Sequence, residues 1–325
     1  MLMSGGETFF GCECSSLEAG AAAETEAKLS AVLEIMRPKP SPFELLRIGG
    51  GRDGAYLVPD DLKTVKICFS PGVSNRKRFE DQLTADYGMT CHMCDYSSDE
   101  TKFATPLIPG KQTFDKLWLE PRAGADQIDL RSWIDKFYPG GCGDLMLQMD
   151  IEGAEYRNIL AADLPTLARF RIMVLEVHGL GKLTSAPVLH SVLYPFFSKI
   201  GALFTCIHAH TNNHSDEIFI RGNQINLSDA IELTFLRTDV LPPGPARDLR
   251  PVLLPHPLDI TNAQQKKPIV LSKFWCGGAR PFQSRKKILE DQFAYQRARI
   301  RHRIIRANKA IRRFFKPARS GSVSK

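Results

Sequence analysis

Short apolar runs recur through residues 43–240, and helix-like or loop stretches separate them. Runs of this length are typical of strands buried on both faces of a sheet. They are Val65–Phe69, Met89–Cys94, Asp144–Met149, Arg171–Val177, Leu203–Ala209 and Ile231–Leu236. Strands that alternate with helices predict an α/β fold with a mostly parallel sheet. The apolar-polar alternation within the last run favours an antiparallel edge strand there.

The rest of the chain divides around this central region. Residues 1–42 form an N-terminal extension with one helix-like stretch, Glu24–Met36, which a run of prolines from Pro38 onward ends. Residues 43–240 form the main domain. Residues 241–281 are rich in proline and predict an irregular wrap over the body. Residues 282–325 predict a basic helix followed by a short tail.

The basic charge is concentrated at one end of the chain. Residues 280–325 hold 15 Lys and Arg residues and two acids, which leaves 28 basic and 34 acidic residues elsewhere. The body is therefore mildly acidic although the whole chain carries a net charge of +7. An acidic body argues against nucleic acid as a partner.

The stretch 282–316 reads as a basic amphipathic helix. Its apolar positions fall on one side at helical spacing: Leu289, Phe293, Ile300, Ile304, Ile311 and Phe315. Such a helix can bind an anionic membrane surface or the groove of a partner protein. Packing of the same apolar stripe on the body is the alternative interpretation.

Targeting signals are not visible in the sequence. No apolar run reaches the ~18–20 residues that span a bilayer, and the N-terminus lacks a basic segment followed by an apolar one. The eight cysteines are scattered, which favours reduced thiols over a disulfide framework. We therefore expect a cytoplasmic protein.

Polar residues gather where the first two runs end. Ser70, Gly72 and Ser74 follow the first run, and Glu80 lies in the helix-like stretch after them. In an open parallel sheet, ligands bind beyond the carboxyl ends of the strands. Asp95 ends the next run, where a carboxylate can accept hydrogen bonds from both ribose hydroxyls of a nucleoside cofactor. Alternatively, Asp95 caps a turn with the two serines that follow it.

The most specific motif is Gln148-Met-Asp-Ile-Glu-Gly-Ala-Glu155. An apolar strand runs into Asp150, Glu152 and Glu155 around a single glycine. Carboxylates this close repel one another unless cations or donors face them. A functional role is favoured over an ordinary acidic helix start.

This motif resembles the K-I-D-V-E-G-A-E signature of FkbM-like, S-adenosylmethionine-dependent methyltransferases. Arg47-Ile-Gly-Gly-Gly-Arg-Asp-Gly-Ala-Tyr56 is similar to the R-I-G-x-x-x-D-G-G-Y element of the methyltransferase-like protein 24 branch of that family. The loop after Phe69, the stretch from His208 to Asn213 and the segment Leu258–Asn262 resemble further elements of the branch. The resemblance covers roughly residues 45–265.

The resemblance implies a class I methyltransferase fold, a Rossmann-like three-layer α/β/α structure with a seven-stranded, mostly parallel sheet. It also implies S-adenosylmethionine as cofactor and O-methylation of a hydroxyl on a sugar, a glycan or a small metabolite. The cofactor-binding residues would be Ser70, Gly72, Ser74, Glu80, Asp95, Asp150, Ile151 and Glu152. Asp95 would hold the ribose, and Asp150 would lie beside the methionine end and the acceptor.

A hydroxyl acceptor requires a base, and we expect it among Asp150, His178 and His208. Both histidines follow or occupy predicted strands of the sheet, and imidazole has a suitable pKa range. Each could instead be an ordinary hydrogen-bonded residue of the fold.

A metal ion is not required by the sequence pattern. Asp150, Glu152, Glu176, His178, His208 and His210 could converge, but their spacing matches no defined metal motif. The Cys91-x-x-Cys94 pair lies on a predicted strand, where alternation sends the two thiols to opposite faces. We therefore predict no metal site.

Two other functions stay open. A non-catalytic adaptor would keep the fold and act through the basic helix, and the departures Pro71 and Arg131 from the family pattern support it. A nicotinamide-dependent enzyme is disfavoured because the first loop has one glycine where a pyrophosphate needs closer backbone approach.

Overall fold

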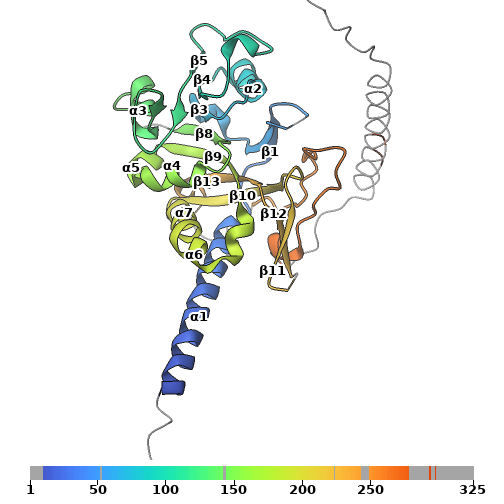
Figure 1. Cartoon of the computed structure of the whole chain (residues 1–325). Coiled ribbons are helices and arrows are strands. Elements are labelled where there is room, and N and C mark those ends of the chain that lie inside the picture. The colour runs from blue at the N-terminus through green and yellow to red at the C-terminus, as the bar shows by residue number, and fades with distance from the viewer. Residues whose placement is uncertain are drawn as a thin grey trace, which may run out of the picture.

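A seven-stranded sheet forms the centre of the molecule (Figure 1). The structure is a computed structural model that describes residues 10–277, apart from 52, 142–143, 223 and 243–248, and also residues 293 and 297. Across the sheet the strands are β10 (Phe204–Thr211), β13 (Ile231–Arg237), β9 (Phe170–Val177), β8 (Leu145–Met149), β3 (Ile67–Pro71), β4 (Thr90–Cys94) and β5 (Gln112–Asp115). The prediction of an α/β fold is confirmed, and every predicted apolar run forms a strand.

The sheet is mostly parallel, as predicted. β9, β8, β3, β4 and β5 pair in parallel, whereas β13 is antiparallel to both of its neighbours, β9 and β10. The prediction that Ile231–Leu236 is an edge strand is wrong, because β13 lies between β9 and β10. The polar residues of its alternation face buried partners instead of solvent: Thr234 donates to the Leu57 carbonyl, and Glu232 pairs with His210.

Side chains of the central strands alternate between two apolar cores. Cys68, Met146 and Val174 point into the core beneath α2 (Arg78–Tyr87) and the hairpin of β1 (Leu45–Ile48) and β2 (Tyr56–Pro59). Phe69 and Leu147 point into the larger core on the other face. Cys91 and Cys94 of β4 likewise enter different cores, which confirms the prediction for that pair.

The larger core is covered by helices from both halves of the chain. They are α1 (Phe10–Met36), α3 (Leu130–Phe137), α4 (Glu155–Ala161), α5 (Leu164–Leu167), α6 (Ala186–Val188) and α7 (Tyr194–Gly201). Among residues 20–36 of α1, whose burial is described, Leu29, Val32, Leu33 and Met36 near the C-terminal end are buried, and the helix projects away from the body toward its N-terminus (Figure 1). The predicted helix Glu24–Met36 is thus confirmed, and it begins earlier than expected.

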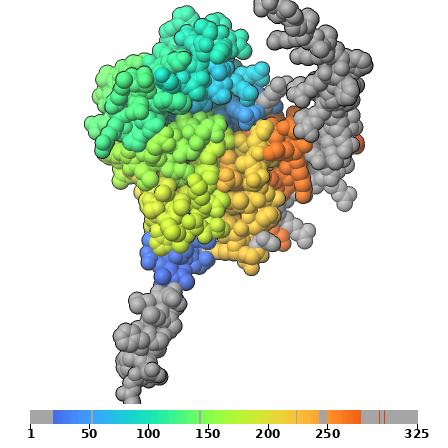
Figure 2. Space-filling model, in the orientation of Figure 1, coloured from blue at the N-terminus to red at the C-terminus, as the bar shows by residue number. Residues whose placement is uncertain are grey.

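The remaining strands form two small two-stranded sheets outside the central sheet, here called ribbons: β6 (Trp118–Leu119) with β7 (Gln127–Ile128), and β11 (Glu217–Ile220) with β12 (Ile225–Ser228). Residues 249–277, here called the covering segment, lie against this second ribbon and β10 (Figure 2). Its Trp275 is fully buried and donates a hydrogen bond to the Asn226 carbonyl. The covering segment is largely irregular because proline recurs along it.

The predicted basic helix 282–316 lies outside the described residues except for Phe293 and Arg297. In the described part of the chain, no helix is both long and apolar enough to cross a membrane.

Candidate functional site

A cavity of about 830 Å³ opens at the carboxyl ends of β3 and β8. Loops from distant parts of the sequence line it, including the β1–β2 connection, the start of α2 and the covering segment. Among the lining residues are Asp53, Tyr56, Gly72, Ser74, Glu80, Asp150, Glu152, His214 and Asn262. This is the position at which open parallel sheets bind ligands.

Gly72 lets the two strand ends meet. Its φ is +86°, and a Cβ placed on it would lie 1.7 Å from the Asp150 carbonyl oxygen. The Asp150 amide donates to the Pro71 carbonyl, and the Gly72 amide donates to the Cys94 carbonyl. No other residue fits so close a backbone approach. The predicted cofactor residues Gly72 and Asp150 are therefore in contact on the wall of one cavity.

Asp95 lies beside the cavity wall but is not among the cavity-lining residues. One carboxylate oxygen accepts from the Ser97 amide and hydroxyl, and the other accepts from the Ser74 amide and the Ser98 hydroxyl. Burial acts to raise the pKa of Asp95, but these hydrogen bonds outweigh it and lower the pKa. The carboxylate thus accepts four hydrogen bonds within the protein, which is the turn-capping arrangement that the sequence offered as the alternative, and the ribose role stays a prediction.

Ser70 and Glu80 form a buried polar cluster under the cavity floor. The Ser70 hydroxyl lies within hydrogen-bonding distance of the Glu80 carboxylate and of the Gln148 side-chain oxygen. Burial raises the pKa of Glu80 to about 7, against the effect of the Ser70 hydrogen bond. Glu80 and Gln148 line the cavity, whereas Ser70 supports them from beneath.

The acidic motif forms a tight turn between β8 and α4. Glu152 adopts φ +54°, an uncommon conformation for a residue with a side chain, and its side chain is 87% exposed. Glu155 is fully buried and accepts hydrogen bonds from the amides of Ile151 and Gly153. The Ile151 side chain packs against the larger core, so it does not reach the cavity.

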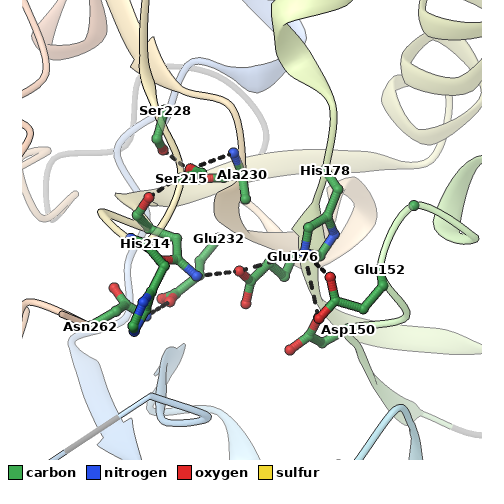
Figure 3. A network of polar contacts seen from close by, with 12 residues as sticks. Asp150, Glu152, Glu176, His178, His214, Ser215, Ser228, Ala230, Glu232 and Asn262 are labelled. Carbon is green, nitrogen blue, oxygen red and sulfur yellow. Dashed lines mark hydrogen bonds and ion pairs between the residues drawn. The ribbon is translucent and has the colours of Figure 1, made fainter.

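His178 lies within 4 Å of four carboxylates, and Figure 3 shows three of them, those of Asp150, Glu152 and Glu176. Its Nδ1 is 3.2 Å from Glu155 Oε1, and its Nε2 is 3.8 Å from both Asp150 Oδ1 and Glu176 Oε1. Glu152 Oε2 is 3.6 Å from the same nitrogen. The structure thus brings together Asp150, His178 and the acidic turn, as the sequence predicted.

Burial and mutual repulsion set the protonation of this group. Burial raises the pKa of Asp150 to about 7, with the His178 charge acting in the opposite direction. Burial, followed by the charges of Asp150 and Glu232, raises the pKa of Glu176. Burial opposes protonation of His178, but Glu155 and Asp150 outweigh it and raise its pKa.

His208 is not in the cavity, which corrects the prediction that it could act as a base there. It lies in the middle of β10 rather than at a strand end, is buried, and hydrogen-bonds Asp259 at 3.0 Å. It lines a separate cavity of about 240 Å³ with Lys39 and Arg250. His210 pairs with Glu232 and likewise does not line the cavity.

The sequence prediction missed cavity residues from the first hairpin and the covering segment. Asp53 and Tyr56 belong to the R-I-G-x-x-x-D-G element, and Tyr56 donates to Asp150 Oδ2 at 3.4 Å. Asn262 donates to Asp53 Oδ1 and to Glu232 Oε1. The resemblance already marked both segments, so that signal could have placed these residues in the site.

Comparisons with known proteins add little. No family model matches the chain, and no curated protein matches it. Among solved structures, it is similar to a tryptophan-to-alanine mutant of the 16S rRNA (adenine(1408)-N(1))-methyltransferase from Catenulisporales acidiphilia, with 12% identity and a TM-score of 0.28. The match covers 62% of this chain and 100% of that one. A likeness of this size carries no argument about function, although the sheet itself is consistent with a Rossmann-like methyltransferase fold.

Proposed function

We propose that this chain is an S-adenosylmethionine-dependent methyltransferase that methylates a hydroxyl group. One observation carries the proposal. The segments that resemble the methyltransferase family, around Asp53, Gly72, Asp150 and Asn262, are far apart in sequence and line the same cavity. That cavity lies at the carboxyl ends of adjacent parallel strands, where a nucleoside cofactor binds in folds of this class.

Methyl transfer from a sulfonium mainly requires the protein to align the acceptor with the methyl–sulfur bond. In methyl transfer, the acceptor oxygen forms a bond to the methyl carbon while the carbon–sulfur bond breaks, and sulfur keeps the electron pair. The sulfonium becomes a neutral thioether, and the hydroxyl proton passes to a base. The protein must hold acceptor and cofactor in line and exclude competing water.

Residue roles follow from the cavity wall. Gly72 and Ser74 would border the cofactor, and the acidic residues Asp53, Glu80 and Asp150 would favour its sulfonium charge. Asp95 would shape the Ser74 loop. Asp150 lines the cavity and can receive the acceptor proton, and His178, whose Nε2 lies 3.8 Å from Asp150 Oδ1, can stabilise or take over that proton.

The decisive experiment is a thermal-shift titration of the full chain with S-adenosylmethionine, S-adenosylhomocysteine and NAD. A ligand at 100 times its Kd stabilises the folded state by about 2.7 kcal/mol, so a bound cofactor gives a clear rise in Tm. We expect a shift with the first two ligands and none with NAD. No shift with any ligand would reject the proposal and favour the adaptor; a shift with NAD alone would favour a dehydrogenase.

A matched pair of variants locates the binding site. Ser74→Trp puts a bulky side chain on the cavity wall and should remove the S-adenosylhomocysteine shift. Ser191→Trp places the same side chain at an exposed position remote from the cavity, where the Ser191 hydroxyl only contacts the Pro187 carbonyl. A shift that survives in the Ser74 variant places the cofactor elsewhere.

A further inference from the structure

We propose that Asp150, Glu176 and His178 bind one divalent transition-metal ion at the end of β8 and β9. The three ligand atoms lie within 4.8 Å of one another, and His178 Nε2 is 3.8 Å from each carboxylate oxygen. Ligand atoms are roughly 3.4 Å apart around a tetrahedral ion with bonds of about 2.1 Å, so a small side-chain rotation closes the site. The sequence spacing gave no sign of it, because the ligands come from two strands.

Neighbouring residues orient the three ligand side chains by hydrogen bonds. His178 Nδ1 faces the buried Glu155 carboxylate at 3.2 Å, which turns Nε2 toward the two carboxylates. Metal-binding histidines regularly donate their other ring N–H to a carboxylate in this way. The tautomer with a free Nε2 lone pair is the one that Glu155 favours.

Both carboxylates are oriented in the same manner. Asn212 Nδ2 donates to Glu176 Oε1, the oxygen that faces His178, and Tyr56 donates to Asp150 Oδ2, the oxygen that does not. The remaining atom, Asp150 Oδ1, is buried and accepts no hydrogen bond from any described residue. A buried carboxylate oxygen without a donor is costly unless a cation faces it.

No lysine or arginine in the described part of the chain forms an ion pair with Asp150, Glu155 or Glu176, whereas His178 lies 3.2–3.8 Å from an oxygen of each. Two carboxylates and one imidazole are ligands suited to Mn²⁺, Fe²⁺ or Zn²⁺ rather than to Ca²⁺, which takes six to eight oxygen ligands. Three protein ligands leave coordination positions open for an exogenous oxygen.

The role of the ion rests on the proposed function, whereas its binding does not. An acceptor hydroxyl at an open position would lie beside Asp150 on the cavity wall. Held by Asp150, Glu176 and His178, the ion would lower the pKa of such a hydroxyl, and the proton released would pass to cavity water. Asp150 and His178 would then act on the acceptor through the ion instead of taking the proton themselves.

The test is a titration of the full chain with Mn²⁺ after dialysis against EDTA. Binding is measured by electron paramagnetic resonance, as the loss of the free Mn²⁺ signal. We expect one ion per chain, displaced by Zn²⁺. Glu176→Gln and His178→Ala should each weaken binding at least tenfold, while far-ultraviolet circular dichroism shows that both variants are folded.

Glu152→Gln is the matched control. It removes a negative charge 3.6 Å from His178 Nε2 but none of the three ligands, so affinity should change less than threefold. Absence of stoichiometric binding, or an equal loss in Glu152→Gln and Glu176→Gln, would overturn the metal site. An S-adenosylhomocysteine shift in EDTA separates the two proposals: a shift without metal binding leaves only the methyltransferase, and metal binding without a shift leaves only the metal site.

Discussion

Gly72 is the residue on which the candidate site depends most directly. Its backbone touches the Asp150 carbonyl, so it sets the distance between the loop after β3 and the acidic turn after β8. The neighbouring Ser74 and Asn75 also adopt positive φ, at +46° and +57°. Uncommon backbone conformations are concentrated where a loop must approach a ligand.

Substitution of Gly72 by alanine should disrupt the site. The added methyl group would collide with the backbone. We expect the free energy of unfolding to fall by about 1–3 kcal/mol, and the rise in Tm with S-adenosylhomocysteine to disappear. Gly88→Ala is the control, because Gly88 also has positive φ, +65°, but has open space around its Cβ position. Urea denaturation of both variants measures the difference, and equal losses would contradict the contact.

Asp95 tests whether a residue binds cofactor or positions a loop. Asp95→Asn places an N–H group against a backbone donor, either Ser74 or Ser97, whichever way the amide turns. We expect a loss on the order of 1–3 kcal/mol in the ligand-free protein. Ser132→Ala serves as a control on an exposed capping bond. Unchanged stability with lost cofactor affinity would instead restore the ribose role.

At the level of elements, β10, β13 and the covering segment are joined by buried histidine–carboxylate pairs. His210 faces Glu232 on β13, Asp259 of the covering segment and Arg47 of β1, with His208 two residues away on its own strand. Burial opposes its protonation, but the two carboxylates outweigh this and raise the pKa of His210 to about 9.

This pairing gives stability a defined pH dependence. An unfolded histidine has a pKa of about 6.5, so the contribution is complete below that pH and is lost as pH rises through about 9. The wild-type protein should lose on the order of 2 kcal/mol more than His210→Gln between pH 6.5 and 9, in urea denaturation. His190→Gln, a partly exposed histidine beside Glu24, should keep the wild-type slope. Parallel slopes for wild type and His210→Gln would show that His210 is neutral in the fold.

Most strands of the central sheet could be predicted from the sequence, whereas the existence of β5 and the position of β13 could not. Both faces of the sheet are covered, so strands β3, β4, β8, β9 and β10 are buried and contain the apolar runs that predict them. β5 has a single fully buried position and gave no apolar run. β13 alternates as an edge strand would, but its polar residues serve buried partners, and only the assembled sheet shows this.

The candidate site shows the same limit. The acidic motif after β8 and Gly72 could be predicted, because strand ends converge in a parallel sheet. The roles of Asp95 and His208 depend on partners that the sequence does not reveal. Asp95 accepts hydrogen bonds from serine hydroxyls and backbone amides, and His208 hydrogen-bonds Asp259, 51 residues away. Glu176 and His178 become metal-ligand candidates only beside Asp150, which belongs to another strand.

At the scale of the whole molecule, charge separates the body from the C-terminal segment. The acidic body and the strongly basic residues 280–325 predict an anionic partner for the segment and not for the body. Deletion of residues 282–325 should leave cofactor binding unchanged and remove binding to vesicles that contain anionic lipid. Sedimentation with such vesicles at two salt concentrations measures this, because screening weakens the attraction.

A second variant separates charge from apolar insertion. Ile300→Asp with Ile304→Asp keeps every basic residue and interrupts the apolar stripe, so it should also lose vesicle binding. Full binding by this variant would show that charge alone suffices, and no binding by the wild type would exclude a membrane role.

The interior position of β13 means that the sheet can be completed only after β13 has been synthesised. β10 leaves the ribosome before β13 but touches the sheet only through it, so a nascent chain ending between residues 211 and 231 exposes the flank of β9 with no strand to cover it. Such an open flank can capture the strand of another chain. Completion of the sheet therefore awaits residues 231–237, and a chain truncated just before them should aggregate more readily than the full chain.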